Sequence, residues 1–144
     1  MACVEKCHRN AITIKDDLKY YNALIDTKKC VDCGLCTKVC PRENDNDMSK
    51  PKWWYQGWAD SEIREYASSG GAASAIIRTF IKNGGYVASC LFNSGKFVFE
   101  VTNEMAVARK FAGSKYVKSN PEKIYGKIQS LLKANQKVLF IGLP

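Results

Sequence analysis

The segment Cys30-Val-Asp-Cys33-Gly-Leu-Cys36-Thr-Lys-Val-Cys40-Pro41 decides how the N-terminal part of this chain folds. Its cysteines follow the pattern C-x2-C-x2-C-x3-C-P, in which three closely spaced thiolates surround one corner of a cubane cluster. Gly34 allows the backbone to turn tightly around such a cluster, and Pro41 ends any helix that begins within the run. Every defined position of the pattern is present in order, so the segment predicts a [4Fe–4S] site.

A shorter cysteine run precedes this segment. Cys3 and Cys7 are spaced C-x3-C, like the third and fourth cysteines of a complete run. Where two clusters are bound, the fourth cysteine of each run completes the cluster of the other run. The predicted ligands of one complete cluster are therefore Cys7, Cys30, Cys33 and Cys36. Cys3 and Cys40 remain as the ligands of a second cluster that lacks its other two.

Two other interpretations of the cysteines stay open. A zinc ion can be held by four cysteine ligands, although such sites usually divide them into two well-separated pairs. Disulfides are disfavoured, because the composition is that of a protein from a reducing compartment. His8 stands where the first run would carry proline, and it is either a substitute ligand or a solvated side chain.

Length and charge limit the remaining possibilities. The chain has 144 residues and a formal net charge of +8. It contains neither an apolar run long enough to span a membrane nor a signal-peptide pattern, so we expect a cytoplasmic protein. Residues 1–50 contain nine Lys or Arg against eight Asp or Glu, whereas residues 51–144 contain thirteen against six. The second part should therefore favour an anionic ligand or partner.

The predicted fold class is α+β, with a boundary in a polar linker. Residues 1–48 should form a small ferredoxin-like 4Fe–4S domain whose first cysteine run is truncated. It would contain a hairpin of strands 11–15 and 20–25, turning at Asp16-Asp17, and a short helix after the start of the main cysteine run. Residues 49–144 should form an α/β domain with a mixed, incomplete sheet.

Hydrophobic periodicity and turn residues predict the elements of the second domain. We expect helices at 72–82, at 104–111 and from Asn120-Pro121 onward, and strands at 86–92, 97–102 and 137–141. Asn93-Ser-Gly95 should join the first two strands as a hairpin turn. The predicted apolar helix faces are Ile76, Ile77, Phe80 and Ile81 in the first helix, and Ile124, Ile128, Leu131 and Leu132 in the last. Cys90 should be a small buried residue, and the last strand should be buried.

Two loops are candidates for contact with a ligand. Ser68-Ser69-Gly70-Gly71 precedes a helix, where free backbone N–H groups and the helix dipole suit a phosphate. Gly113-Ser-Lys-Tyr116-Val-Lys-Ser119 offers the ammonium of Lys115 and the serine hydroxyl groups to an anionic cofactor. Both segments also have a structural interpretation, the first as an ordinary helix cap and the second as a surface connection.

Three tryptophans lie within Trp53-Trp54-Tyr55-Gln56-Gly57-Trp58. One interpretation is that these rings clamp the two domains together, and the other is an aromatic wall for a flat ring or a partner protein. Single-stranded nucleic acid is disfavoured, because the aromatic residues are clustered rather than interleaved with basic ones.

The order of these segments resembles the coenzyme F420 hydrogenase/dehydrogenase beta-subunit family. The resemblance rests on the ferredoxin-type cysteine run, then Ser-Ser-Gly-Gly, Gly-Ser-Lys-Tyr-Val-x-Ser, and a strand ending in Gly-x-Pro. It implies an iron–sulfur flavoprotein that passes electrons between clusters, a bound FAD, and coenzyme F420 or another acceptor. The candidate cofactor-binding residues are Ser69, Gly70, Gly71, Ser114, Lys115 and Tyr116. The resemblance implies no particular catalytic residues and no particular substrate.

The chain departs from this family at both ends. The first cysteine run lacks its leading cysteines, and the Cys-Gln that usually follows Gly-x-Pro is absent. The chain therefore resembles the N-terminal portion of a family member, whose partners would be redox proteins or the remaining reductase subunits. The main hypothesis is an electron-transfer module of a flavin-dependent oxidoreductase. The alternative is a non-catalytic fragment, adaptor or binding module with a structural four-cysteine metal site.

Overall fold

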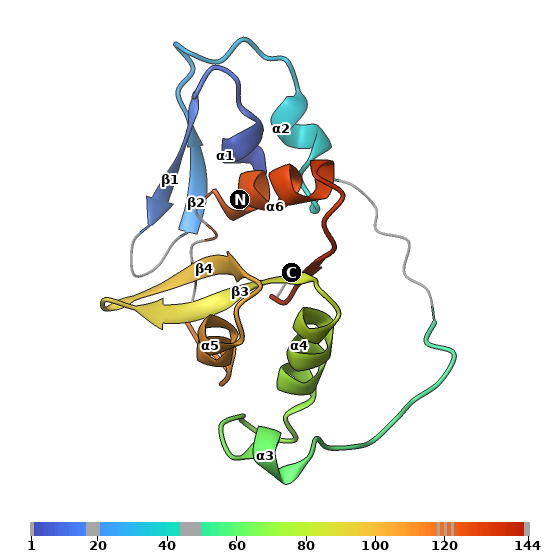
Figure 1. Ribbon diagram of the computed structural model, residues 1–144. Helices are drawn as coiled ribbons and strands as arrows, with labels where there is room; N and C mark the ends of the chain where they lie inside the picture. The colour runs from blue at the N-terminus through green and yellow to red at the C-terminus, as the bar shows by residue number, and fades with distance from the viewer. Residues whose placement is uncertain are drawn as a thin grey trace. The chain divides into compact units, whose positions relative to one another are not determined.

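A computed structural model describes residues 2–16, 21–43, 50–117, 119, 121 and 123–142 of the chain (Figure 1). Contacts between Cα atoms divide the chain into two compact units, Met1–Trp53 and Trp54–Pro144. This division falls close to the predicted boundary after residue 48. None of the helices in the described ranges has both the length and the apolar composition needed to cross a bilayer.

The first unit contains two short helices and one hairpin. Its elements are α1 (Ala2–Lys6), β1 (Ile12–Asp16), β2 (Tyr21–Ile25) and α2 (Leu35–Lys38). Strands β1 and β2 are antiparallel, with Ile12 opposite Ile25 and Asp16 opposite Tyr21, so the predicted hairpin is present. Strand β1 runs through Asp16, one residue beyond the predicted strand, and the turn at residues 17–20 lies outside the described residues.

Helix α2 begins inside the main cysteine run, as predicted. Gly34 precedes it in the left-handed conformation, with φ of 69°, which glycine adopts at little cost. The N–H of Lys38 then donates to the carbonyl of Gly34 at 3.2 Å. Helices α1 and α2, which carry Cys3 and Cys36, contact each other. The backbone therefore brings one cysteine from each of the two runs to neighbouring helices.

The second unit is built on a mixed sheet, as expected for the predicted α+β fold. Strands β3 (Tyr86–Asn93), β4 (Lys96–Thr102) and β5 (Val138–Phe140) lie in the order β4-β3-β5. Strand β3 is antiparallel to β4 and parallel to β5. The β3–β4 turn is one residue shorter than predicted, because Asn93 pairs with Lys96. Its central residues, Ser94 and Gly95, have φ of 49° and 81°, as a type I′ turn requires.

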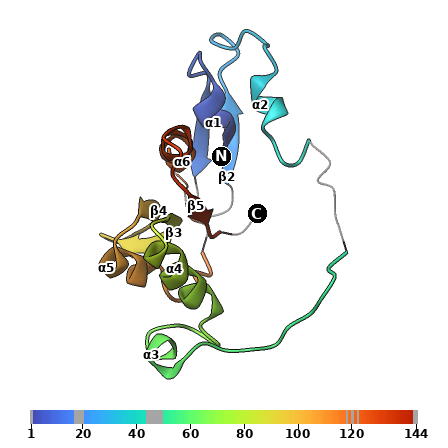
Figure 2. The same cartoon turned by 45° about the vertical axis from the view of Figure 1, so that its right-hand side comes forward.

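Helices cover both faces of this sheet. Figures 1 and 2 show α4 (Ala72–Lys82) and α5 (Met105–Ala108) on one face of the β3–β4 hairpin and α6 (Ile124–Lys133) on the other. A 3-10 helix, η1 (Arg109–Phe111), continues α5, and a short helix, α3 (Ser61–Arg64), precedes α4. The buried core on the α4 side consists of Ile77, Val87, Leu91, Ala108 and Phe111.

The predicted apolar faces of two helices need correction. In α4, Ile77 is buried and Phe80 and Ile81 pack against the core, but the side chain of Ile76 is 54% exposed. In α6, Ile124 is fully buried, whereas Leu132 is 54% exposed. Ile76 directly precedes the buried Ile77, Leu132 directly follows the half-buried Leu131, and a step of one residue turns the side chain about 100° around the helix. Both residues therefore point away from the sheet.

The C-terminal end of α4 agrees with the prediction, whereas the start of α6 differs from it. Helix α4 ends as predicted: the N–H of Gly84, with φ of 75°, donates to the carbonyl of Ile81, and the N–H of Gly85 donates to that of Phe80. Helix α6 was expected to start with an Asn120 cap and Pro121, but it begins at Ile124, after Lys123 in the left-handed conformation. Asn120 and Glu122 lie outside the described residues.

The prediction of a buried last strand is wrong. Two residues of β5 are half-buried and Phe140 is 39% exposed. The reason is its position: the sheet order places β5 at an edge, where it pairs with β3 alone.

Candidate cluster ligands and candidate cofactor pocket

All six cysteines of the predicted cluster sites are free thiols in the structure. Cys30 and Cys33 are exposed, and Cys3, Cys7, Cys36 and Cys40 are partly buried. The Sγ atom of Cys7 accepts a hydrogen bond of 3.3 Å from the N–H of Ala11, at the entry to β1. The neighbouring helices α1 and α2 and this donor set of thiols suit a cluster that both runs share.

Among the described residues, no three His, Cys, Asp or Glu side chains lie close enough to form a metal site. A metal or cluster brings its thiolate ligands together as it binds. The number and chemistry of the cysteine thiols, rather than the distances between them, therefore show that these residues suit a cluster. The division of ligands between Cys7 with the main run and Cys3 with Cys40 stays a prediction. The side chain of His8 is exposed, as expected for a solvated residue.

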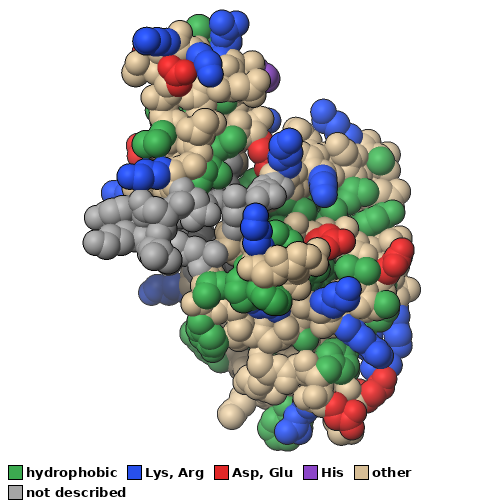
Figure 3. Space-filling view, turned by 90° about the vertical axis from the view of Figure 1, so that its left-hand side faces the viewer, with side chains coloured by type: hydrophobic (Ala, Val, Ile, Leu, Met, Phe, Trp, Pro, Cys, Tyr) green, Lys and Arg blue, Asp and Glu red, His purple; other side chains and the backbone are tan. Residues whose placement is uncertain are grey.

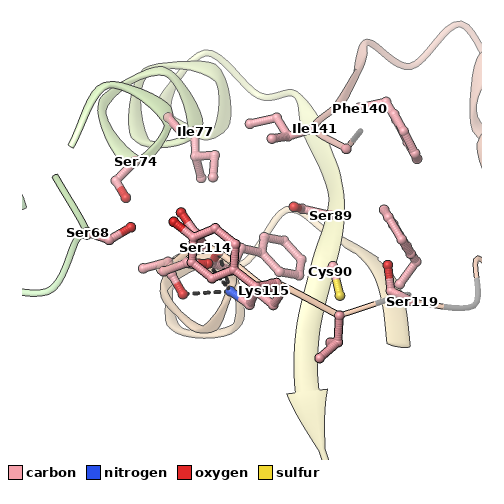
Figure 4. A pocket seen from close by; sticks show the side chains of 18 of the residues that line it. Ser68, Ser74, Ile77, Ser89, Cys90, Ser114, Lys115, Ser119, Phe140 and Ile141 are labelled. Carbon is pink, nitrogen blue, oxygen red and sulfur yellow. Dashed lines mark hydrogen bonds between the residues drawn. The ribbon is translucent and has the colours of Figure 1, made fainter. Parts of the chain in front are cut away.

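The second unit contains a cavity of about 470 Å³ (Figure 4). Its walls come from the loop before α4 and the first turns of that helix, from the middle of β3, from the loop after η1, and from the segment around β5. The predicted Ser/Gly loop and Gly-Ser-Lys-Tyr loop, more than forty residues apart in the sequence, therefore border the same cavity.

Three serine hydroxyls line the cavity, two of them, Ser68 and Ser74, at one end. Ser68 precedes α4, Ser74 lies in its first turn, and Ser89 lies on β3; their oxygen atoms point into the space between these elements (Figure 4). Ser74 and Ser89 are only 8% and 6% exposed. Neither hydroxyl has a hydrogen bond to another described residue. Leaving a buried hydroxyl unpaired costs about 1–3 kcal/mol, so this end of the cavity favours a polar ligand group or water.

The N-terminus of α4 faces the same end. Gly71, with φ of 75°, is the N-cap, and the first intrahelical bond runs from the N–H of Ala75 to its carbonyl. The N–H groups of residues 72–74 therefore have no carbonyl partner within the helix. Together with the dipole of an 11-residue helix, they favour an anion beside Ser68 and Ser74.

Aromatic rings line the opposite end. Phe99 on β4 and Phe140 on β5 are stacked, with ring centroids 5.4 Å apart and an interplanar angle of 4°. Tyr125 on α6 lies 6.0 Å from Phe140, also stacked. All three rings line the cavity. The cavity thus joins an end suited to an anion to an end suited to a flat ring.

Lys115 lines the cavity, but its ammonium group is already bound. It donates hydrogen bonds to the carbonyl oxygens of Phe111, Ala112 and Gly113, at 2.7, 2.6 and 2.8 Å. An ammonium has three N–H donors, so all of them are used. Burial lowers the pKa of Lys115. Lys115 therefore holds the loop after η1 in this structure, and it has no donor left for a phosphate.

The other candidate cofactor residues have different positions. Gly71 and Ser114 line the cavity, as does Tyr116, whose ring is 95% exposed. Ser69 and Gly70 do not line it. The carbonyl of Gly70 accepts a bond of 2.8 Å from the N–H of Ala59, which ties this part of the loop to the chain before α3.

Several residues that line the cavity are not among the candidate cofactor-binding residues: Ser68, Ser74, Ser89, Phe99, Ser119, Tyr125 and Phe140. Ser68 and Ser119 lie inside the two loops that the sequence indicates as candidates for ligand contact. The other five lie in helices and strands that carry no local motif, so no pattern in the sequence points to them. Cys90 is buried, as predicted, and also lines the cavity.

The aromatic residues of the segment 53–58 lie on the surface. The side chains of Trp53, Trp54, Tyr55 and Trp58 are 74–90% exposed. Whether they join the two units or receive a partner stays a prediction.

On the face drawn in Figure 3, Lys and Arg side chains are dispersed among hydrophobic ones, and the side chains shown in colour form no single basic patch.

Comparison with known families decides the character of the first unit. Residues 1–44 match the family model of the 4Fe-4S dicluster domain. The chain carries an N-terminal iron–sulfur domain. Such domains bind [4Fe–4S] clusters for electron transfer, and the matched residues include all six predicted ligand cysteines. A search of the curated proteins found no match. The resemblance of the second unit to the F420 hydrogenase beta subunits stays a prediction.

Proposed function

We propose that this chain passes electrons between a [4Fe–4S] cluster in its first unit and a flavin or deazaflavin held in the cavity of its second unit. The observation that carries the proposal is the two-ended cavity. Unpaired serine hydroxyls and the start of α4 suit a phosphate, while stacked rings suit an isoalloxazine or deazaflavin ring.

The roles of the residues follow from these positions. Cys7, Cys30, Cys33 and Cys36 would hold the complete cluster. Ser68, Ser74 and the N–H groups at the start of α4 would bind the phosphate, and Phe99, Tyr125 and Phe140 would border the ring. When bound, a flavin supplies the ability to exchange electrons one or two at a time, which links a one-electron cluster to a hydride donor or acceptor. The redox partner would be another protein or subunit.

Anaerobic reconstitution tests this proposal. Iron, acid-labile sulfide and the visible spectrum would be measured first, followed by titration with FMN, FAD and coenzyme F420 monitored by fluorescence. We expect a brown protein that binds at least one of these ligands. In the loaded protein, photoreduction of the flavin should also bleach the cluster.

Cys36→Ser provides the matched control, because it should bind flavin without the cluster response. Stoichiometric zinc in a colourless protein, or no binding of any flavin or deazaflavin, would contradict the proposal.

A further inference from the structure

The cavity runs past the edge of strand β3. The backbone groups at this edge limit which ligand groups can bind beside it. Ser89 and Cys90 both line it, although consecutive residues of a strand point to opposite faces of the sheet. A space that both residues line therefore runs past the strand edge between them. Figure 4 shows both residues on β3, with Phe140 and Ile141 nearby.

Among the residues that the structure describes, none pairs with this edge where the cavity meets it. Within that part of the chain, β3 pairs with β5 through Tyr86, Val87 and Ala88, because β5 ends at Phe140. The last backbone bond that the described residues show on this side runs from the N–H of Ile141 to the carbonyl of Ala88. Within a strand, alternate residues direct their N–H and C=O groups to the same side. Cys90, two residues beyond Ala88, therefore presents one donor and one acceptor where β5 would have continued.

We infer that the ring of the bound ligand takes the place of β5 at Cys90 and pairs with its backbone through an imide edge. A ring N–H donates to the Cys90 carbonyl, and an adjacent ring carbonyl accepts from the Cys90 N–H. The buried hydroxyl of Ser89, which has no partner among the described residues, can donate to a further ring carbonyl. This inference rests on the proposed function, since the pyrimidine edge of a flavin or deazaflavin carries this arrangement of groups.

The stacked rings of Phe99 and Phe140 support the same orientation of the ligand ring. Phe140 is the last residue of β5 and lies opposite Ala88 in the register, so its ring borders the point where the strand stops. A planar ligand that continues the β5 position would meet Phe140, which is stacked on Phe99. The backbone groups of Cys90 form hydrogen bonds only with the imide edge of the ring. Ligands altered at the opposite, benzenoid edge should therefore still bind.

Ligand analogues test the pairing directly. FMN would be compared with 3-methyl-FMN, in which a methyl group replaces the hydrogen of the imide nitrogen, and with an FMN lacking the 7- and 8-methyl groups. Loss of two backbone hydrogen bonds should weaken binding of 3-methyl-FMN by about tenfold or more. The analogue altered at the benzenoid edge should bind like FMN.

A further measurement locates the pairing on the backbone. In a ¹⁵N-labelled protein, FMN should shift the amide resonance of Cys90 more than that of Ala88, whose N–H faces the same side but is covered by β5. Equal affinity for FMN and 3-methyl-FMN would overturn the pairing while leaving flavin binding intact. Failure of every flavin to bind would overturn the proposed function and the pairing with it.

Discussion

The Nζ atom of Lys115 lies 2.7 Å from the carbonyl oxygen of Phe111, the last residue of η1. Two more carbonyls, those of Ala112 and Gly113, accept from the same ammonium. The charge therefore compensates the carbonyls that end this helix, and it fixes the loop that contributes Ser114 and Tyr116 to the cavity.

Replacing Lys115 by methionine keeps the apolar stem and removes the ammonium. We expect Lys115→Met to lower the free energy of unfolding by about 1–3 kcal/mol, because carbonyl groups lose charge-assisted hydrogen bonds. Chemical denaturation measures this change.

Lys110→Met, on the exposed surface of η1, is the matched control and should have little effect. The salt dependence of FMN binding should be the same in the parent and in Lys115→Met. A weaker salt dependence in the variant, with unchanged stability, would instead show that Lys115 contacts the phosphate.

The cluster ligands can be separated by single substitutions. Cys7→Ser and Cys36→Ser should each abolish the same [4Fe–4S] absorption and electron paramagnetic resonance signals, because both cysteines would belong to one ligand set. Cys40→Ser should retain that cluster. If Cys40→Ser abolished it and Cys7→Ser did not, the main run would bind its cluster without the first run.

Ser74→Ala should have opposite effects on the free and the bound protein. Removing a buried hydroxyl without a described partner should leave the stability of the free protein unchanged or raise it. Flavin phosphate should bind about two- to tenfold more weakly, which corresponds to one lost hydrogen bond. Thermal melts and fluorescence titrations measure the two quantities.

Ser130→Ala, at an exposed position on α6, serves as the control for Ser74→Ala. A large loss of stability in Ser74→Ala with no change in flavin affinity would contradict a role of this hydroxyl in binding.

Gly85 is required by the ring of Phe80. A Cβ atom at this buried position would overlap that ring, which packs against the core beside Ile77. We expect Gly85→Ala to destabilise the second unit by about 1–3 kcal/mol, as overpacked cores do. Gly57→Ala, where an added Cβ meets no atom within 4 Å, should be neutral. Equal melting temperatures for the two variants would show that Phe80 can move aside without cost.

The contact between α3 and α4 should be sensitive to acid. A hydrogen bond of 2.9 Å from Arg78 lowers the pKa of Glu62 below its ordinary value of 4.5. The folded state thus binds its proton less readily than the unfolded state. The stabilisation is present above pH 4.5 and is lost as the pH falls through the lower, folded-state pKa. Glu62→Gln should remove this part of the pH dependence of the free energy of unfolding, measured by denaturation between about pH 3 and 6 at constant ionic strength. An unchanged pH profile in the variant would contradict the coupling between Glu62 and Arg78.

Features that depend on residues close together in the chain could be predicted from the sequence. The cysteine spacing identified the iron–sulfur domain, because cluster ligation requires thiols at short fixed intervals. Helix α4 was predicted with its observed bounds, because its apolar period and its Gly84-Gly85 ending agree. The loop residues Gly71 and Ser114 could also be found locally, since glycine and serine in such loops are typical of phosphate contacts.

Which residues line the cavity, and which groups the ammonium of Lys115 contacts, depend on how the chain packs in three dimensions. Ser74 and Ser89 line the same cavity because α4 packs on β3, and no local pattern records that packing. No described strand covers the edge at Cys90, because β5 ends at Phe140 although the apolar run continues through Ile141. Lys115 was expected to bind an anion, but nearby carbonyls at the end of η1 bind its ammonium. A long flexible cation can reach several partners, and the folded backbone determines which of them lie within hydrogen-bonding distance.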